Sequence, residues 1–384
     1  MFKLPNSVGP FFDVAEFDLA TFVRYCAEET ERSEYSHAAG VEKKVVIYDG
    51  RYLAAKGHDD YEILGELHTC LADGPGVLVI RDAYADTSLI DEVTAVFFEI
   101  IEAEKAEQRV AADHFGQNER IWNALQKVCV RAPALFVPYY GNPAIALIAR
   151  AWLGPGYQMT AQVNNVKPGS EAQAPHRDYH LGFQRAATIA QYPARVQRMS
   201  QLLTLQGAIA HTDMPLLAGP TQFMPHSHKY PGGYLAFKEA DFVAYFKQHA
   251  IQLPLSKGDM VFFSPALYHG AGNNRSDADR LANLLQISSA FGRPMESVNR
   301  FAMLEAVYPH LLSHASQMTS LERVNAIAAV ADSYAFPTNL DTDPPLGGNA
   351  PESAADFVGR ALDERWPWVT LREHFLDYDG RRQA

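Results

Sequence analysis

The segment "QAPHRDYHLG", residues 173–182, decides how this chain is interpreted, because it places two imidazoles and a carboxylate within five positions. It follows the alternating run "YQMTAQVNNV", residues 157–166, which is typical of a β-strand. In extended backbone, side chains two residues apart point to the same side. His176 and Asp178 would therefore project together, and an imidazole nitrogen beside a carboxylate oxygen can fill two adjacent positions around a divalent metal ion.

A third ligand has to come from a distant strand, and the best candidate is His269 in "KGDMVFFSPALYHGAGNN", residues 257–274. Two histidines and one carboxylate form the facial set of non-haem Fe(II) oxygenases, which leaves positions on the metal open. Eleven residues further on, Arg280 opens the apolar run "RLANLLQIS". An arginine directed into an apolar pocket needs an anionic partner, and its planar fork suits a carboxylate. The pattern predicts a dicarboxylate that chelates the metal and meets Arg280 at its far end.

Short strands separated by Gly, Pro and Asn turns fill the chain from residue 157 to about 290, among them a predicted strand in residues 199–212. Many short strands in succession favour a sandwich or barrel over a parallel sheet built from βαβ units. Helical patterns precede and follow the strands. In the first long helix, Ser88 and Asp91 have the spacing of a capping box and predict where it begins.

The length of 384 residues allows two domains or one elaborated β domain. We expect a single domain with an N-terminal extension (1–70), helices plus the β core (71–295) and a helical C-terminal extension (296–384). The apolar helices of the C-terminal extension are expected either to cover the mouth of the site or to form a contact between subunits.

The composition narrows the class of protein. Lys and Arg total 33 against 45 Asp and Glu, so the net charge of −12 argues against nonspecific binding to nucleic acid or to anionic lipid. Three scattered cysteines provide no disulfide framework and no CxxC metal pair, which suits a reducing compartment. The N-terminus lacks the pattern of a secretory signal, and no apolar run approaches the roughly 20 residues that span a bilayer. We expect a cytoplasmic protein that acts on a small molecule.

Four motifs together make the chain recognisable: "HRD" at 176–178, "GPTQFMPHSHK" at 219–229, the segment 257–274 quoted above, and Arg280. In this order they resemble the phytanoyl-CoA dioxygenase family of Fe(II)/2-oxoglutarate oxygenases, over roughly residues 70 to 292. The resemblance implies a mainly β fold, a double-stranded β-helix (a cupin-like jelly roll) with N-terminal helices packed on it. It also implies Fe(II), 2-oxoglutarate and O2 as cofactor and cosubstrates.

Carried over residue by residue, the resemblance makes His176, Asp178 and His269 the iron ligands. Arg280 matches the residue that pairs with the far carboxylate of 2-oxoglutarate. Asn165, in "NNVKPG", is similar to a polar strand residue that contacts the cosubstrate, and Gln173 is a further match for cosubstrate binding.

The implied reaction oxidises an unactivated C–H bond of a small organic molecule, such as a secondary metabolite, with release of succinate and CO2. Asp178 argues against halogenation, because related halogenases have a small residue in place of this carboxylate. One departure from the family pattern is Ala271, where relatives often carry a serine whose hydroxyl contacts 2-oxoglutarate.

Two other functions stay open at this point: a cupin-like metalloenzyme that does not use 2-oxoglutarate, and a catalytically inactive jelly-roll binding protein. Several polar residues have alternative interpretations as well. His180 either lines the substrate site or is structural, while His226 and His228 are expected to be structural. Residues 113–123 either line a substrate entrance or begin an ordinary helix.

Overall fold

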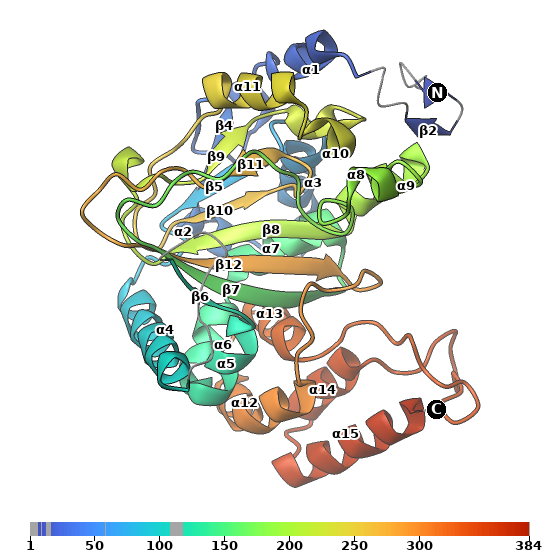
Figure 1. Cartoon of the computed structure of the whole chain (residues 1–384). Coiled ribbons are helices and arrows are strands. Elements are labelled where there is room, and N and C mark those ends of the chain that lie inside the picture. The colour runs from blue at the N-terminus through green and yellow to red at the C-terminus, as the bar shows by residue number, and fades with distance from the viewer. Residues whose placement is uncertain (1–6, 9, 13–16, 58, 108–117, 384) are drawn as a thin grey trace.

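An eight-stranded sheet runs through the middle of the molecule in the computed structural model, which describes residues 7–8, 10–12, 17–57, 59–107 and 118–383 (Figure 1). All neighbouring strands in it are antiparallel except β4 and β5, which are parallel. The strands, in spatial order, are β3 (Gly40–Glu42), β4 (Val45–Asp49), β5 (Val77–Arg81), β10 (Met260–Phe263), β8 (Thr204–Ala210), β12 (Arg280–Ser289), β7 (Tyr157–Val166) and β6 (Glu119–Ile121).

A second, smaller sheet faces the large one. It pairs β9 (Gln222–Met224) with β11 (Tyr268–Gly270), and single bridges add His176 beside His269 and Ile251 beside Phe223. Phe223 packs between the sheets against apolar side chains of the large sheet, such as Val261. Two facing, mainly antiparallel sheets with flanking helices form the predicted jelly-roll core, so the expected fold class is confirmed. A separate short hairpin joins β1 (Ser7–Val8) to β2 (Phe11–Phe12).

Successive side chains of β7 point to opposite faces of the large sheet, one covered by helices and the other facing the cavity. Tyr157 and Val163 are fully buried in the main core with the helices. Gln162 and Asn164, on the opposite face of the same strand, line the cavity between the sheets. The sheet therefore has one apolar face for packing and one face that can carry polar groups toward a ligand.

Helices that precede the jelly roll cover the outer face of the large sheet (Figure 1). They are α2 (Gly50–Ala54), α3 (Tyr61–Ala72), α4 (Ser88–Ala106), α5 (Ala124–Arg131), α6 (Pro133–Tyr140) and α7 (Pro143–Leu153). The predicted capping box of α4 is wrong: Ser88 is already inside the helix, and the N-cap is Thr87, whose side chain makes no capping bond. The Asp86 carboxylate accepts the Ser88 N–H instead, at 2.9 Å.

Other short helices lie on the side of the small sheet. They are α1 (Leu19–Cys26), α8 (Ala186–Ile189), α9 (Ala194–Leu202), α10 (Gly233–Ala236) and α11 (Ala240–His249). The chain also contains the 3-10 turns Arg32–Glu34, Leu216–Ala218 and Ser227–Lys229. The strand predicted over 199–212 begins only at Thr204, because the preceding residues complete α9. None of the helices in the described ranges is long and apolar enough to cross a membrane.

The C-terminal extension forms four helices: α12 (Arg300–His314), α13 (Ser320–Val330), α14 (Ala354–Asp363) and α15 (Trp368–Arg382). They pack against the helical layer on the outer face of the large sheet, below it in Figure 1. The Tyr157 hydroxyl of β7 donates a 2.7 Å hydrogen bond to the Asn325 side chain of α13. The helices expected within residues 296–384 are therefore present, and α15 is the last of them.

Candidate metal and cosubstrate site

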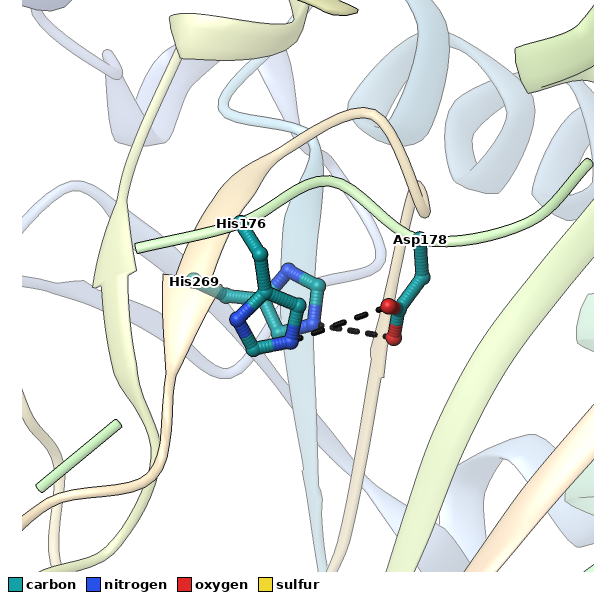
Figure 2. Close-up of side chains that lie close together, drawn as sticks. All are labelled: His176, Asp178 and His269. Atoms are coloured by element: carbon teal, nitrogen blue, oxygen red, sulfur yellow. Dashed lines mark ion pairs between the residues drawn. The ribbon is translucent and has the colours of Figure 1, made fainter. Parts of the chain in front are cut away.

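Three side chains from two separate segments converge at the predicted metal site: His176, Asp178 and His269 (Figure 2). The His176 Nε2 lies 3.7 Å from Asp178 Oδ1, and the His269 Nε2 lies 3.4 Å from Asp178 Oδ2. One donor atom from each of the three lies within 4.8 Å of the other two. Among the described residues, this is the one group of three or more His, Cys, Asp or Glu that could hold a metal ion.

Backbone pairing sets this convergence. His176 and His269 exchange both hydrogen bonds of an antiparallel bridge, with N···O distances of 3.0 and 3.2 Å. The Asp178 N–H then donates to the Pro265 carbonyl at 3.0 Å, so the extended segment continues through the carboxylate. Directly after it, Tyr179 and His180 have φ values of 62° and 41°, which turn the chain sharply away.

A hydrogen bond at the far side of each ring sets the imidazole tautomers. The His176 Nδ1 lies 3.0 Å from the Ala174 carbonyl oxygen, and the His269 Nδ1 lies 2.8 Å from that of Leu267. A carbonyl only accepts, so each Nδ1 carries the proton and each Nε2 presents a lone pair toward Asp178. Metal-ligating histidines are held in this way.

Burial and neighbouring side chains shift the pKa values of His176 and Asp178, the two metal-binding groups of the HRD segment. Burial is the largest influence on His176 and, together with the nearby His269, lowers the pKa of the imidazole. Burial also tends to raise the pKa of Asp178, but the contacts of the carboxylate with His269, His176 and Gln206 outweigh burial and leave that pKa well below its ordinary value. At neutral pH Asp178 is therefore ionised and His176 is neutral, and these are the protonation states that bind a cation.

The cluster opens into a cavity of about 660 Å³ between the two sheets, a volume within the range of small-molecule sites. One side of the cavity is apolar, with walls from β4, β5 and β10 that include Val45, Val79 and Phe263. The other side, formed by β6, β7, β8 and β12, carries amide side chains and two arginines. The site can therefore orient a ligand by polar contacts on one side and exclude water on the other.

Arg280 lies in the same cavity and is 6% exposed. Its Nη1 donates to the Ala218 carbonyl at 3.2 Å, and no carboxylate of the described residues lies within ion-pair distance of the guanidinium. Burial lowers the pKa of Arg280 to about 10, so the group still carries its charge at neutral pH. A buried cation without a protein counter-ion is expected to bind an anionic ligand.

Asn165 does not line the cavity. Its Nδ2 donates to the Glu119 carboxylate at 2.8 Å and to the Asp279 carboxylate at 2.9 Å, on the opposite face of β7. The neighbouring Asn164 is the amide that faces the cavity. The alternation of the strand contained this information, since Asn165 shares its face with the core residues from Tyr157 to Val163.

Gln173 does line the cavity, where its Oε1 accepts the Ala271 N–H at 3.0 Å. His180 does not line it, and its Nδ1 lies 3.5 Å from the Ser200 hydroxyl. Of the residues 113–123, those from 113 to 117 lie outside the described part of the chain, whereas Arg120 and Trp122 contribute to the cavity wall.

His226 and His228 are structural, as expected. The His226 Nε2 lies 3.2 Å from the Thr30 hydroxyl, and the His228 Nε2 lies 3.1 Å from the Ala72 carbonyl oxygen. Burial lowers the pKa of both imidazoles to about 3.

Sequence reasoning missed Gln206, a residue of β8 whose Nε2 lies 2.5 Å from Asp178 Oδ2. It also missed Phe183 and Met295, which line the cavity while leaving 55% and 37% of their own surface exposed. No sequence spacing marks these residues, because each is brought to the cavity by tertiary contacts.

A model of one protein family, phytanoyl-CoA dioxygenase (PhyH), matches residues 69–282. The chain belongs to the phytanoyl-CoA dioxygenase family. The dioxygenase cdmD of Talaromyces verruculosus is 27% identical over 165 residues, 43% of this chain and 49% of that protein. The dioxygenase cdmA of the same organism is 32% identical over 165 residues, 42% of this chain and 46% of that one. The chain thus spans about half the length of the curated relatives that it matches.

Solved structures of other proteins are also similar to this member of the phytanoyl-CoA dioxygenase family. The non-haem α-ketoglutarate-dependent carbocyclase SnoK from nogalamycin biosynthesis is 22% identical, with a TM-score of 0.43, over 61% of this chain and 88% of that one. The epimerase SnoN from the same biosynthesis is 17% identical, with a TM-score of 0.40, over 60% of this chain and 84% of that one.

The donor set of this family member fits a six-coordinate metal ion. Bonds of about 2.1 Å to nitrogen and oxygen place neighbouring donor atoms roughly 3 Å apart. The separations of the two imidazole Nε2 atoms from the Asp178 oxygens, 3.7 and 3.4 Å, are within a fraction of an ångström of that spacing. Two imidazoles and one carboxylate also form the donor set that Fe(II) takes in non-haem oxygenases.

Proposed function

We propose that this chain is an Fe(II)- and 2-oxoglutarate-dependent oxygenase that oxidises an unactivated C–H bond of a small organic molecule. The observation that carries the proposal is that the three-residue cluster and the Arg280 guanidinium line one cavity. A metal-binding end and a carboxylate-binding end in the same cavity are complementary to a dicarboxylate that chelates a metal.

In this proposal, His176, Asp178 and His269 hold the iron. When bound, iron supplies with O2 and 2-oxoglutarate the oxidising power to break a strong C–H bond, with release of succinate and CO2. Arg280 pairs with the far carboxylate of 2-oxoglutarate and so fixes the direction in which the cosubstrate lies. Gln173 remains a candidate for contacting the cosubstrate, and Asn164 replaces Asn165 as the amide of β7 that can reach it.

The remaining residues of the cavity act by orientation and by exclusion of water. The apolar wall, which includes Val45, Val79 and Phe263, shields the metal site from bulk solvent and so protects a reactive oxidant from side reactions. Asp178 occupies the position that a halide would need on the metal, so hydroxylation or another C–H oxidation is favoured over halogenation. The cavity volume supports a small organic substrate, such as a secondary metabolite.

Two alternative functions can be distinguished from this one by features of the cavity. A cupin-like metalloenzyme without 2-oxoglutarate would have no dicarboxylate for Arg280 to bind, whereas the charge and burial of Arg280 favour one. An inactive binding protein would have no need for two imidazoles whose Nε2 atoms both face Asp178. Both alternatives predict that Fe(II) and 2-oxoglutarate together produce no succinate.

The decisive experiment is an anaerobic titration with Fe(II) and then 2-oxoglutarate, followed by O2 and measurement of succinate across a panel of candidate substrates. In Arg280→Leu, the Kd for 2-oxoglutarate should rise about 10-fold or more, because hydrogen bonds to a charged group are lost. The affinity for Fe(II) should stay nearly unchanged.

Arg275→Leu is the matched control, since Arg275 lies exposed in a loop outside this cavity. It should bind 2-oxoglutarate as the unaltered chain does. Equal 2-oxoglutarate affinity in Arg280→Leu, or an absence of Fe(II)-dependent succinate formation with every substrate tested, would contradict the proposed function.

A further inference from the structure

Gln206 contacts the metal cluster from the large sheet. It lies on the inner face of β8, is 4% exposed and lines the cavity. Its side chain approaches Asp178 at 2.5 Å, between Nε2 and Oδ2. An ionised carboxylate only accepts hydrogen bonds, so the amide has to present its NH2 group, and the orientation of the amide is fixed by chemistry.

This orientation leaves the other end of the amide unsatisfied. The Gln206 Oε1 is buried and has no hydrogen-bond partner among the described residues. A buried carbonyl oxygen without a partner costs roughly 1–3 kcal/mol. An apolar side chain of the same length would avoid that cost but would also remove the hydrogen bond to the ionised carboxylate, so the reason for a glutamine lies in the group that its N–H contacts.

The carboxylate of Asp178 supplies that reason. Backbone hydrogen bonds fix the position of the residue, but the last torsion of an aspartate is broad and roughly twofold. A hydrogen bond to one oxygen is what holds the plane of the carboxylate. With Gln206 in place, Oδ1 lies 3.7 Å from the His176 Nε2 and Oδ2 lies 3.4 Å from the His269 Nε2.

We propose that Gln206 is a positioning residue of the metal centre: its amide N–H sets the rotation of the Asp178 carboxylate and thereby raises the affinity of the cluster for a divalent cation. The inference rests on the proposed function, because it assumes that the cluster binds a metal. Hydrogen bonds that orient ligating carboxylates contribute about 10-fold to 100-fold to metal affinity in other sites.

Gln286 provides a matched control. It lies directly across from Gln206 on the neighbouring strand β12, is 7% exposed and lines the same cavity. Its Oε1 accepts a hydrogen bond from the Tyr179 hydroxyl, and no contact joins it to the three cluster residues. Replacing it with methionine removes a buried amide from the same surface without touching Asp178.

The test is calorimetric titration of the full chain with Co(II) as the probe, without 2-oxoglutarate and without O2, beside urea unfolding of the metal-free protein. Gln206→Met should raise the Co(II) Kd about 10-fold to 100-fold. It should change the urea midpoint little, because the loss of the hydrogen bond to Asp178 and the removal of the unsatisfied oxygen act on stability in opposite directions. Gln286→Met should bind Co(II) within about twofold of the unaltered chain. If Gln206→Met does not fold, Gln206→Asn, which withdraws the amide by one methylene, should show the same loss of affinity.

Each other result would overturn the inference. Unchanged Co(II) affinity in the Gln206 variant overturns the positioning role but leaves the proposed function intact. A urea midpoint that falls while the Co(II) Kd stays constant assigns Gln206 a structural role instead. If Gln286→Met loses as much Co(II) affinity as Gln206→Met, the loss comes from removing any buried amide of this cavity and not from the contact with Asp178. An unaltered chain that binds no Co(II) overturns this inference and the proposed function together.

Discussion

Arg177, between the two ligands of the HRD segment, points to the opposite side and anchors the segment from behind. The side chain is 1% exposed, and its guanidinium lies between the rings of Tyr234 and Tyr268, at 5.2 and 5.1 Å from their centroids. Its Nη2 donates to the Ser227 carbonyl at 2.7 Å. Cation–π contacts of this kind are worth up to about 2 kcal/mol when desolvated. The alternation that brings His176 and Asp178 together thus also buries a cation that fixes the strand between them.

Gly233, at the start of α10, leaves the space that this guanidinium fills. A Cβ at that position would lie 1.9 Å from the Arg177 Cζ. Gly233→Ala should therefore displace the arginine and lower the free energy of unfolding by about 1–3 kcal/mol, measured by urea denaturation. Gly65→Ala, in α3 with nothing within 4 Å of the added Cβ, is the control and should be neutral or slightly stabilising. Equal stability of the two variants would show that Arg177 moves aside freely.

At the scale of elements, one imidazole joins two helices to the end of a strand. His211 follows β8, and its Nδ1 lies 2.7 Å from the Thr94 hydroxyl of α4 while its Nε2 lies 2.6 Å from the Tyr139 hydroxyl of α6. Burial lowers the pKa of His211 to about 3, with a small opposing effect from the carboxylate of Asp91. The folded protein therefore keeps this ring neutral at pH values where the unfolded chain protonates it.

Acid should destabilise the fold through this residue. The unfolded imidazole takes up a proton below about pH 6.5, while the folded one stays neutral down to about pH 3, so stability falls as pH decreases through that window. The slope approaches about 1.4 kcal/mol per pH unit for one proton. The free energy of unfolding can be measured by urea denaturation at pH 7 and at pH 5. Between these pH values it should fall less in His211→Gln than in the unaltered chain. Parallel losses in the two proteins would contradict this origin.

The elements also show which local patterns could be read from the sequence. The strand over 157–166 was predicted correctly, because strict alternation is visible in a single segment. Residues 199–203 were assigned to a strand, although they complete α9, since a short apolar run has no clear period of its own. Within the expected helical extension, the bounds of α15 were not marked, because only Leu371, Phe375 and Tyr378 are buried among many charged residues.

At the scale of the whole molecule, the C-terminal extension is part of the core. Its helices bury apolar residues such as Leu304, Ala329 and Phe357 in the same cluster as the outer face of the large sheet. In the described part of the chain, no residue after Met295 lines the cavity, so the expectation that the extension covers the mouth is wrong. The alternative, a contact between subunits, stays a prediction, as does the assignment of the whole chain to one domain.

A chain that ends at residue 295 should not form a stable fold. Loss of the C-terminal helices would expose the apolar faces of α6 and α7. It would also remove Asn325, so the buried Tyr157 hydroxyl would lack its hydrogen-bond partner. We expect aggregation in gel filtration and no cooperative thermal transition by circular dichroism. A truncated chain that elutes as a compact species with a cooperative transition would show that the extension is a separate layer that serves assembly alone.

The sequence by itself determined the family, the jelly-roll class and the residues that meet at the cluster. These depend on short spacings: two residues in HRD, eleven from His269 to Arg280, and alternation along each strand. Only the tertiary structure decided what surrounds the cluster. Gln206 lies 28 residues from Asp178 on the opposite sheet, and the apolar wall comes from strands both earlier and later in the chain, β4, β5 and β10. Periodicity is a property of one segment, whereas contacts across the cavity depend on strand register and on the stacking of two sheets, which no local spacing encodes.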